Sequence, residues 1–273
     1  MVCRSCGRLV SVRESRCPLC GAVSPSLFGL GPRLARLGLE IDPIYVLTGL
    51  LLFLYFMSLV GDPQGIRNGG LTFLAPSGEM LVRLGASGKW PVLAADRWWT
   101  PLSAGLLHGD ALHILFNVLW LRQLGADTVA LFGASRTVLL LTLSSVVGFL
   151  LSTFAPTIRL LVFTLGGGLF SVGASAAIFG LLGALLWYSR KSGARALTLH
   201  LWGWAAFLLA WGLINPMVDN YAHLGGFAGG FLGAWLLNPA RPERPWHTLA
   251  ALACALAAIG AVVASVLAPL PLG

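Results

Sequence analysis

Seven long apolar segments set the strongest limit on how this chain can fold. Each approaches the length of about 20 apolar residues that a helix needs to cross a bilayer. Only 10% of the 273 residues are charged and 57% are hydrophobic, whereas a soluble domain carries about 25% charged residues. The sequence therefore predicts an all-α, multi-pass membrane protein in a lipid bilayer. The expected spans are 43–60, 107–131, 136–154, 170–188, 197–214, 220–237 and 248–268.

Basic residues predict the orientation of these spans. With a cytoplasmic N-terminus, twelve Lys and Arg residues lie in cytoplasmic segments and five lie outside, in agreement with the positive-inside rule. The net charge of +8 is then explained by these loops, and no nucleic-acid partner is expected. We expect an integral protein of a bacterial inner membrane. The second, fourth and sixth spans would all run from outside to inside, so polar residues near their starts would lie at similar depth.

Four cysteines near the N-terminus form two CxxC pairs, each followed by Gly. They are Cys3, Cys6, Cys17 and Cys20. This spacing is typical of a tetrahedral structural zinc site with four thiolate ligands. Two disulfides or a redox dithiol are the alternatives, and the reducing cytoplasm disfavours disulfides. We predict a small cytoplasmic zinc-ribbon-like module, for which binding a cytoplasmic partner and gating the rest of the chain are both open as roles.

Composition divides the chain into four parts. The zinc-ribbon-like module is expected at 1–24 and a linker at 25–42, followed by a six-helix core at 43–237. A Pro-rich hinge and one extra C-terminal transmembrane helix occupy 238–273, and this last helix is interpreted as an appendage to the core. The loop at 61–102 mixes Gly, Pro and Trp, which suits a segment at the headgroup level.

Polar side chains in three of the spans are the candidates for function, because polar groups inside a membrane are costly. In the second span, His113 and Asn117 are four residues apart and share one helix face, while His108 lies near the helix entrance. Hydrogen bonding between helices is the alternative for such residues. Two His and an Asn together favour a functional site.

The fourth and sixth spans add a serine and a further histidine. Ser175 lies near the outer start of its span, where unpaired backbone N–H groups can bind an anion, although a lone Ser is commonly a packing residue. His223 lies near the outer start of the sixth span. Small residues four residues apart on these spans let helix backbones approach closely. These packing positions include Gly180, Gly226 and Gly230.

Together these residues permit hydrolytic chemistry. A Ser hydroxyl becomes a nucleophile when a neutral His takes its proton, and the oxyanion that forms needs preorganised donors. Ser175 and His223 supply the first pair, and the Ser175 backbone N–H, His113 and Asn117 are candidate donors. Asp219, one turn before His223, is either a partner of that His or, as we prefer, a helix cap.

This set of residues resembles the rhomboid family of intramembrane serine proteases. The resemblance rests on His108-x4-His113-x3-Asn117, Gly173-x-Ser175 and Ala222-His223-x2-Gly226, in this order, and covers about 43–237. It implies a rhomboid-like six-helix core with Ser175 as nucleophile and His223 as general base. It also implies cleavage of transmembrane protein substrates near the outer membrane face, without a cofactor in catalysis. Oxyanion-stabilising or substrate-positioning roles are implied for His108, His113, Asn117 and Phe179, and a helix-packing role for Gly173.

Three positions depart from the family pattern. The Trp-Arg motif of the first loop is Trp99-Thr100 here, with Arg97 upstream. The residue after the nucleophile is Ala176 rather than Gly, and Phe179 stands where a Tyr commonly stacks under the catalytic His. A Phe keeps the apolar ring face and loses only the hydroxyl. None of these changes removes the Ser–His pair, so activity is expected.

Two other functions are open. One is a catalytically silent rhomboid-like protein that binds membrane helices, against which the intact Ser175 and His223 argue. The other is a transporter with a polar path through the bundle. The absence of carboxylates deep in the spans argues against a transporter.

Overall fold

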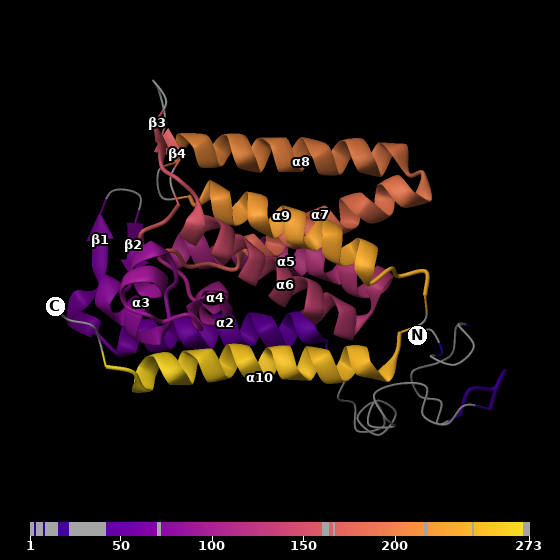
Figure 1. Ribbon diagram of the computed structural model, residues 1–273, viewed down its shortest axis with the longest axis horizontal. Coiled ribbons are helices and arrows are strands. Elements are labelled where there is room, and N and C mark those ends of the chain that lie inside the picture. Colours follow the sequence, from indigo (N-terminus) through magenta and orange to yellow (C-terminus); the bar gives the residue numbers. More distant parts are fainter. Residues whose placement is uncertain are drawn as a thin grey trace.

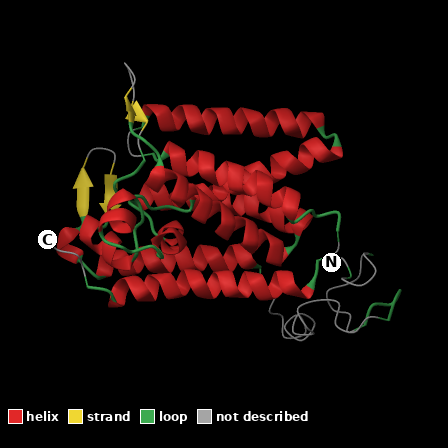
Figure 2. Ribbon diagram, viewed as in Figure 1, coloured by secondary structure: helices red, strands yellow, loops and turns green. Residues whose placement is uncertain are grey.

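Helices make up most of the described chain. The computed structural model describes residues 3, 8, 16–21, 42–69, 72–159, 164–165, 167–215, 218–241 and 243–269. Within these residues the helices form a bundle, and two short β-hairpins lie at one end of it (Figure 1, Figure 2). Each predicted span overlaps one long helix. These helices are α2 (Pro43–Val60), α5 (Ala111–Phe132), α6 (Ala134–Phe154), α7 (Ser175–Ser192), α8 (Arg195–Ile214), α9 (Asn220–Leu236) and α10 (Pro245–Leu267).

Four of the described helices are long and apolar enough to cross a membrane. They are α2, α6, α8 and α10, and α5 joins them when it is taken with the segment Thr100–Leu106, from which it is bent by 92°. The inner helices α7 and α9 have a different composition. In α7, 13 of 18 residues are buried, and a helix enclosed by protein needs small packing residues rather than large lipid-facing ones.

Local sequence signals determine where α5 and α7 begin. The Asp110 carboxylate caps α5 by accepting a hydrogen bond from the His113 backbone N–H at 2.8 Å, as is common for Asp at an N-cap. The second span is therefore helical from Ala111 rather than from 107, and His108 lies in the turn before it. Helix α7 begins at Ser175, five residues later than the expected start of its span. Ser175 is thus the first residue of a helix.

Alternate helices run in opposite directions. Helices α5, α7 and α9 begin at the end of the bundle that carries the hairpins, whereas α2, α6, α8 and α10 end there (Figure 1). The starts of α5, α7 and α9 carry His113, Ser175 and His223, respectively. The topology therefore brings the three candidate segments to the same end of the molecule.

Glycines allow α7 and α9 to pack with their backbones in contact. A Cβ atom on Gly226 would collide with the carbonyl group of Ala176, and one on Gly230 would collide with that of Gly180. On the other side of α7, a Cβ on Gly180 would collide with the Ser144 side chain of α6. Such close approach is typical of small-residue stripes in membrane helices. It keeps the first turns of α7 and α9 side by side.

Short elements fill the connection between α2 and α5. They are η2 (Pro63–Gly65), the antiparallel strands β1 (Arg67–Gly69) and β2 (Thr72–Ala75), α3 (Gly78–Leu84), the π-helical turn η3 (Trp90–Ala94), α4 (Thr100–Ser103) and η4 (Ala104–Leu106). The Tyr55 hydroxyl of α2 donates to the Leu74 carbonyl oxygen at 2.6 Å and fastens this segment to the bundle. A second hairpin, β3 (Ile158–Arg159) with β4 (Thr164–Leu165), lies between α6 and α7.

Helix α10 is an integral part of the bundle. It packs against α6, α4 and α3 and lies along the edge of the bundle next to the α2–α5 connection (Figure 1). The helix predicted as an addition to the six-helix core therefore contacts three elements of that core. Of the expected N-terminal module, Cys3, Arg8 and 16–21 are described, whereas Cys6 and residues 25–41 of the linker lie outside the described residues.

Candidate active site

Ser175 and His223 face each other across the contact between α7 and α9. The distance between Ser175 Oγ and His223 Nε2 is 2.9 Å, which is a hydrogen-bonding distance. Ser175 opens α7 and His223 lies in the first turn of α9. The pair therefore depends on the glycine-mediated approach of the two helices. A nitrogen at this distance is placed to accept the hydroxyl proton.

An aromatic ring holds the His223 side chain in place. The Phe179 and His223 rings are stacked, with centroids 4.1 Å apart and planes 15° apart. His223 is only 8% exposed, and its Nδ1 has no hydrogen-bond partner among the described residues. Stacking and the bond to Ser175, rather than a carboxylate, thus orient the imidazole.

Asp219 caps α9 and is not bonded to the His223 ring. One carboxylate oxygen accepts from the Ala222 backbone N–H at 3.0 Å, and the other accepts from the Ser152 hydroxyl of α6. The preferred interpretation of Asp219 as a helix cap is confirmed. Ser152 was not among the predicted site residues, and it also accepts a hydrogen bond from the Gly168 backbone N–H at 3.0 Å.

The start of α7 offers unpaired backbone donors beside Ser175. No side chain of the described residues caps this helix, and the first N–H groups of a helix have no partner within the helix. Gly173 adopts a φ of +130°, a conformation that favours Gly. A Cβ atom there would lie 2.7 Å from His113 Nε2 and 3.7 Å from Ser175 Oγ. The imidazole of His113 and the hydroxyl of Ser175 therefore border one small space at Gly173.

Asn117 and His108 both contact His113. The Asn117 side-chain amide donates to the His113 carbonyl oxygen at 2.7 Å, and its Oδ1 is buried without a partner among the described residues. His108 is 1% exposed, and its ring meets that of His113 edge-on at a centroid distance of 5.2 Å. Both residues thus contact His113 directly, whereas the structure records no bond from either to Ser175.

Comparison with known proteins identifies the family of this fold and site. The family model described as the Rhomboid domain matches residues 95–240, which is more than half of the chain. The chain belongs to the rhomboid family. It is therefore a multi-pass membrane protein, and the resemblance inferred from the sequence motifs is confirmed.

Named relatives of this rhomboid come from plants, bacteria and a parasite. The chain is 37% identical over 181 residues to RHOMBOID-like protein 4 of Arabidopsis thaliana, covering 63% of this chain and 42% of the relative. It is 30% identical over 198 residues to Rhomboid protease GluP of Bacillus subtilis, covering 71% and 34%. For Rhomboid-like protease 1 of Toxoplasma gondii the identity is 30% over 199 residues, covering 70% and 63%. The chain thus spans less than two thirds of each of these relatives.

A cavity of about 530 Å³ lies beside the segment that leads to Ser175 of this rhomboid. Its lining combines Phe170, Ser171 and Val172 with Ala86 and with residues of β1, α3 and η3. The lining is mainly apolar, and Arg67 and Glu79 are its charged residues. The cavity is therefore suited to apolar groups rather than to a free ion.

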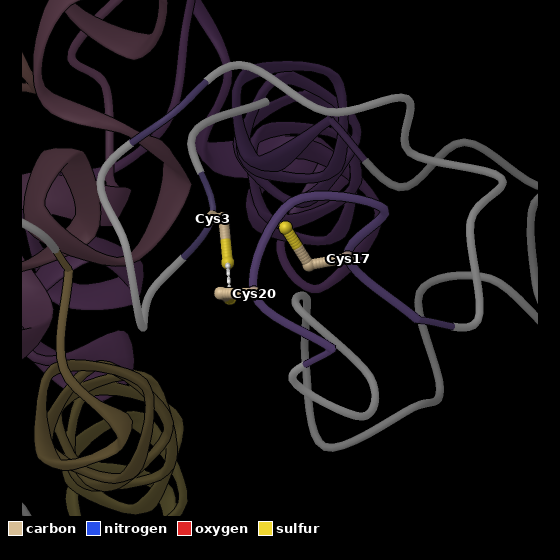
Figure 3. A group of neighbouring side chains, drawn as sticks. All are labelled: Cys3, Cys17 and Cys20. Carbon is tan, nitrogen blue, oxygen red and sulfur yellow. Dashed lines mark hydrogen bonds between the residues drawn. The ribbon is translucent and has the colours of Figure 1, made fainter.

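Three of the predicted zinc ligands lie together. The Sγ atoms of Cys3, Cys17 and Cys20 all lie within 4.8 Å of one another, and those of Cys3 and Cys20 are 3.8 Å apart (Figure 3). In a tetrahedral site with Zn–S bonds of about 2.3 Å, two sulfurs lie about 3.8 Å apart. The donor set and its spacing therefore fit a zinc ion. Cys6 lies outside the described residues.

Proposed function

We propose that this rhomboid is an intramembrane serine endopeptidase with Ser175 as nucleophile and His223 as general base. The observation that carries the proposal is the 2.9 Å separation of Ser175 Oγ and His223 Nε2. Two of the named relatives are called proteases, which supports the same class of activity. The hydroxyl and the imidazole come from two helices whose packing is set by glycines, so the pair is preorganised.

The mechanism follows from the groups around Ser175. His223 Nε2 takes the hydroxyl proton while Oγ attacks the carbonyl carbon of the scissile peptide bond. The resulting oxyanion accepts hydrogen bonds from the Ser175 backbone N–H and from His113, with Asn117 as a further donor. His223 then donates the proton to the leaving amine. A water molecule, deprotonated by His223, hydrolyses the acyl-enzyme and restores Ser175.

We propose that the substrates are transmembrane helices cut near the outer membrane face. Ser175 and His223 lie at the helix starts that share one end of the bundle, and the mainly apolar cavity adjoins this site. A substrate segment must leave its helix to expose a carbonyl, and irregular backbone inside a membrane is tolerated where it is enclosed by protein or water. Substrate side chains next to the cut would then occupy the cavity.

The N-terminal cysteines belong to a separate proposal. Cys3, Cys6, Cys17 and Cys20 would hold a structural zinc ion in a cytoplasmic module of a bacterial inner-membrane protein. The zinc ion would fold this short segment, because four thiolates closed around one ion replace a hydrophobic core. It takes no part in peptide hydrolysis. Such a module would either bind a cytoplasmic partner or gate the enzyme.

Cleavage of a defined substrate tests the proposed activity. The purified full-length protein in lipid nanodiscs is incubated with a panel of single-span proteins, and mass spectrometry locates any new termini. We expect cuts near the outer end of the span that are absent with Ser175→Ala. Ser144→Ala is the matched control, because Ser144 is a buried α6 serine whose hydroxyl has no partner among the described residues. Binding of helices without cleavage, and no fluorophosphonate labelling of Ser175, would instead identify a silent rhomboid.

A further inference from the structure

We propose that α10 is a positioning element for the active site, with Arg97 and Ser265 as the residues that transmit its effect. The C-terminal end of α10 holds the segment 85–104, and this segment holds Gly173 next to Ser175. The inference rests on the proposed protease function. It assigns a catalytic consequence to the last helix and to an arginine that stands away from the family's usual position.

Arg97 ties the loop to the end of α10. Its side chain is 2% exposed, and Nη1 donates to the Val82 carbonyl oxygen at 2.7 Å while Nη2 donates to the Ser265 carbonyl oxygen at 2.5 Å. One guanidinium therefore joins α3 and α10. Removal of this side chain would leave the Val82 and Ser265 carbonyl oxygens without these partners.

Ser265 is enclosed by the loop on its other sides. The Trp99 indole N–H donates to the Ser265 hydroxyl at 2.9 Å. Gly85, with a φ of +110°, lies so close to α10 that a Cβ atom there would be 2.7 Å from the Ser265 hydroxyl. The site accepts only a small side chain at position 265. Ser265 is 0% exposed, which is consistent with this fit.

The loop segment in turn holds the residues before Ser175. The Ser103 hydroxyl donates to the Gly85 carbonyl oxygen at 2.8 Å, and the next residue, Ala104, accepts a hydrogen bond from the Gly173 backbone N–H at 3.0 Å. A second link is the pair of backbone bonds between Ser87 and Ser171, at 3.1 and 2.7 Å. Both links end within four residues of Ser175.

The other end of α10 is also fixed. The hydroxyls of Ser135 in α6 and Thr248 in α10 are hydrogen-bonded at 3.0 Å. Arg136 of α6 donates to the carbonyl oxygen of Arg241 in the hinge at 2.7 Å. Lipid provides little hydrophobic force to hold one apolar helix against another, so these polar contacts set the depth of α10 and hence the height of Ser265.

A change at position 265 should therefore alter turnover rather than only stability. In Ser265→Leu the larger side chain pushes α10 away from Gly85 and moves the carbonyl oxygen that Arg97 binds. Displacement of Gly173 by a fraction of an ångström would then reduce kcat by about tenfold, since about 1 Å of misplacement can cost about a hundredfold. Ser265→Ala keeps the backbone carbonyl and should retain most of kcat, and Arg97→Lys should be intermediate.

The test measures kcat per active site and local protection in the full-length protein. Active sites are titrated with a fluorophosphonate, so unfolded molecules do not count, and the melting temperature is recorded for each variant. Val263→Leu is the matched control, because Val263 lies on the exposed face of α10. We expect Ser265→Leu to lower kcat per labelled site with KM nearly unchanged, together with a lower melting temperature from overpacking, and Arg97→Lys to follow in part.

Hydrogen exchange separates this inference from the proposed function. Peptides covering 167–174 should exchange faster in Ser265→Leu than in the wild type and Val263→Leu. Unchanged exchange there, or an unchanged kcat per labelled site with only a lower melting temperature, would overturn the positioning role. A wild-type protein with neither cleavage nor Ser175 labelling would overturn the protease function, and the exchange data would still decide whether α10 positions Gly173.

Discussion

Phe179 stacks on His223 with ring centroids 4.1 Å apart and an angle of 15° between the planes. Replacement by Ala would remove the surface that holds the imidazole in line with Ser175. Such aromatic pairs contribute about 0.5–1.5 kcal/mol, so we expect kcat of Phe179→Ala to fall by about tenfold or less. Phe179→Tyr should keep the ring contact and most of the activity. Cleavage rates of the two variants, corrected for labelled active sites, check this expectation.

Because α7 and α9 pack so closely, adding one methyl group at Gly226 should strongly reduce stability and cleavage. In Gly226→Ala the new Cβ collides with the Ala176 carbonyl group, which cannot move without separating the helices. Overpacking of this kind costs about 1–3 kcal/mol and would also move His223 away from Ser175. We expect a lower melting temperature and loss of cleavage.

Gly203→Ala is the control for this change. No atom lies within 4 Å of the position that its Cβ would take, so stability and cleavage should both be retained. Equal behaviour of the two alanine variants would contradict the close packing of α7 on α9.

A substitution at Gly173 should affect only the surroundings of Ser175. Its φ of +130° and the 2.7 Å approach of His113 leave no space for a side chain. Gly173→Ala should therefore displace His113 from the space beside Ser175 and lower kcat by at least about tenfold, as removal of an oxyanion donor does. Fluorophosphonate labelling should slow in parallel. Unchanged labelling kinetics would show that His113 has no role at this position.

Two substitutions at Asp219 test whether this residue caps α9 or takes part in catalysis. Asp219→Asn keeps an oxygen for the Ala222 backbone N–H and should leave kcat nearly unchanged, because the carboxylate makes no hydrogen bond to the His223 ring. Asp219→Ala removes the cap and should lower the stability by about 0.5–2 kcal/mol. Thermal unfolding and cleavage assays on both variants give the comparison. A large loss of kcat in Asp219→Asn at normal stability would revive Asp219 as a partner of His223.

If the N-terminal cysteines bind zinc, the protein should contain this metal, and its loss should not affect Ser175. We expect about one zinc ion per full-length chain by elemental analysis, and loss of this zinc in a Cys3→Ser/Cys6→Ser double variant, since a structural site is held by four ligands. Fluorophosphonate labelling of Ser175 should persist in that variant. Zinc content equal to that of the wild type would refute the assignment.

Much of the helical framework could be predicted because each signal is local. The apolar segments depend on composition within about 20 residues, and each overlaps one helix of the structure. The helix starts were less accurate, since Asp110 and Gly173 decide them through capping and backbone conformation. The polar residues of three spans also indicated the family without any knowledge of tertiary contacts.

The contacts between Arg97 and α10 could not be predicted from the sequence. Arg97 and Ser265 are 168 residues apart in the sequence, and nothing in the neighbourhood of either indicates the other. The same holds for Ser152 and Asp219. An apolar helix looks the same in sequence whether it lies alone in lipid or packs against a loop.

The sequence alone therefore determined that this chain is a helical membrane protein of the rhomboid family, since apolar length and residue spacing are local properties. Only the tertiary structure decided which groups meet. Two contacts depend on the relative placement of whole helices. They are the 2.9 Å approach of Ser175 to His223 and the close approach of the Ser265 hydroxyl to Gly85. That placement results from many close backbone contacts acting together, and no single segment encodes it.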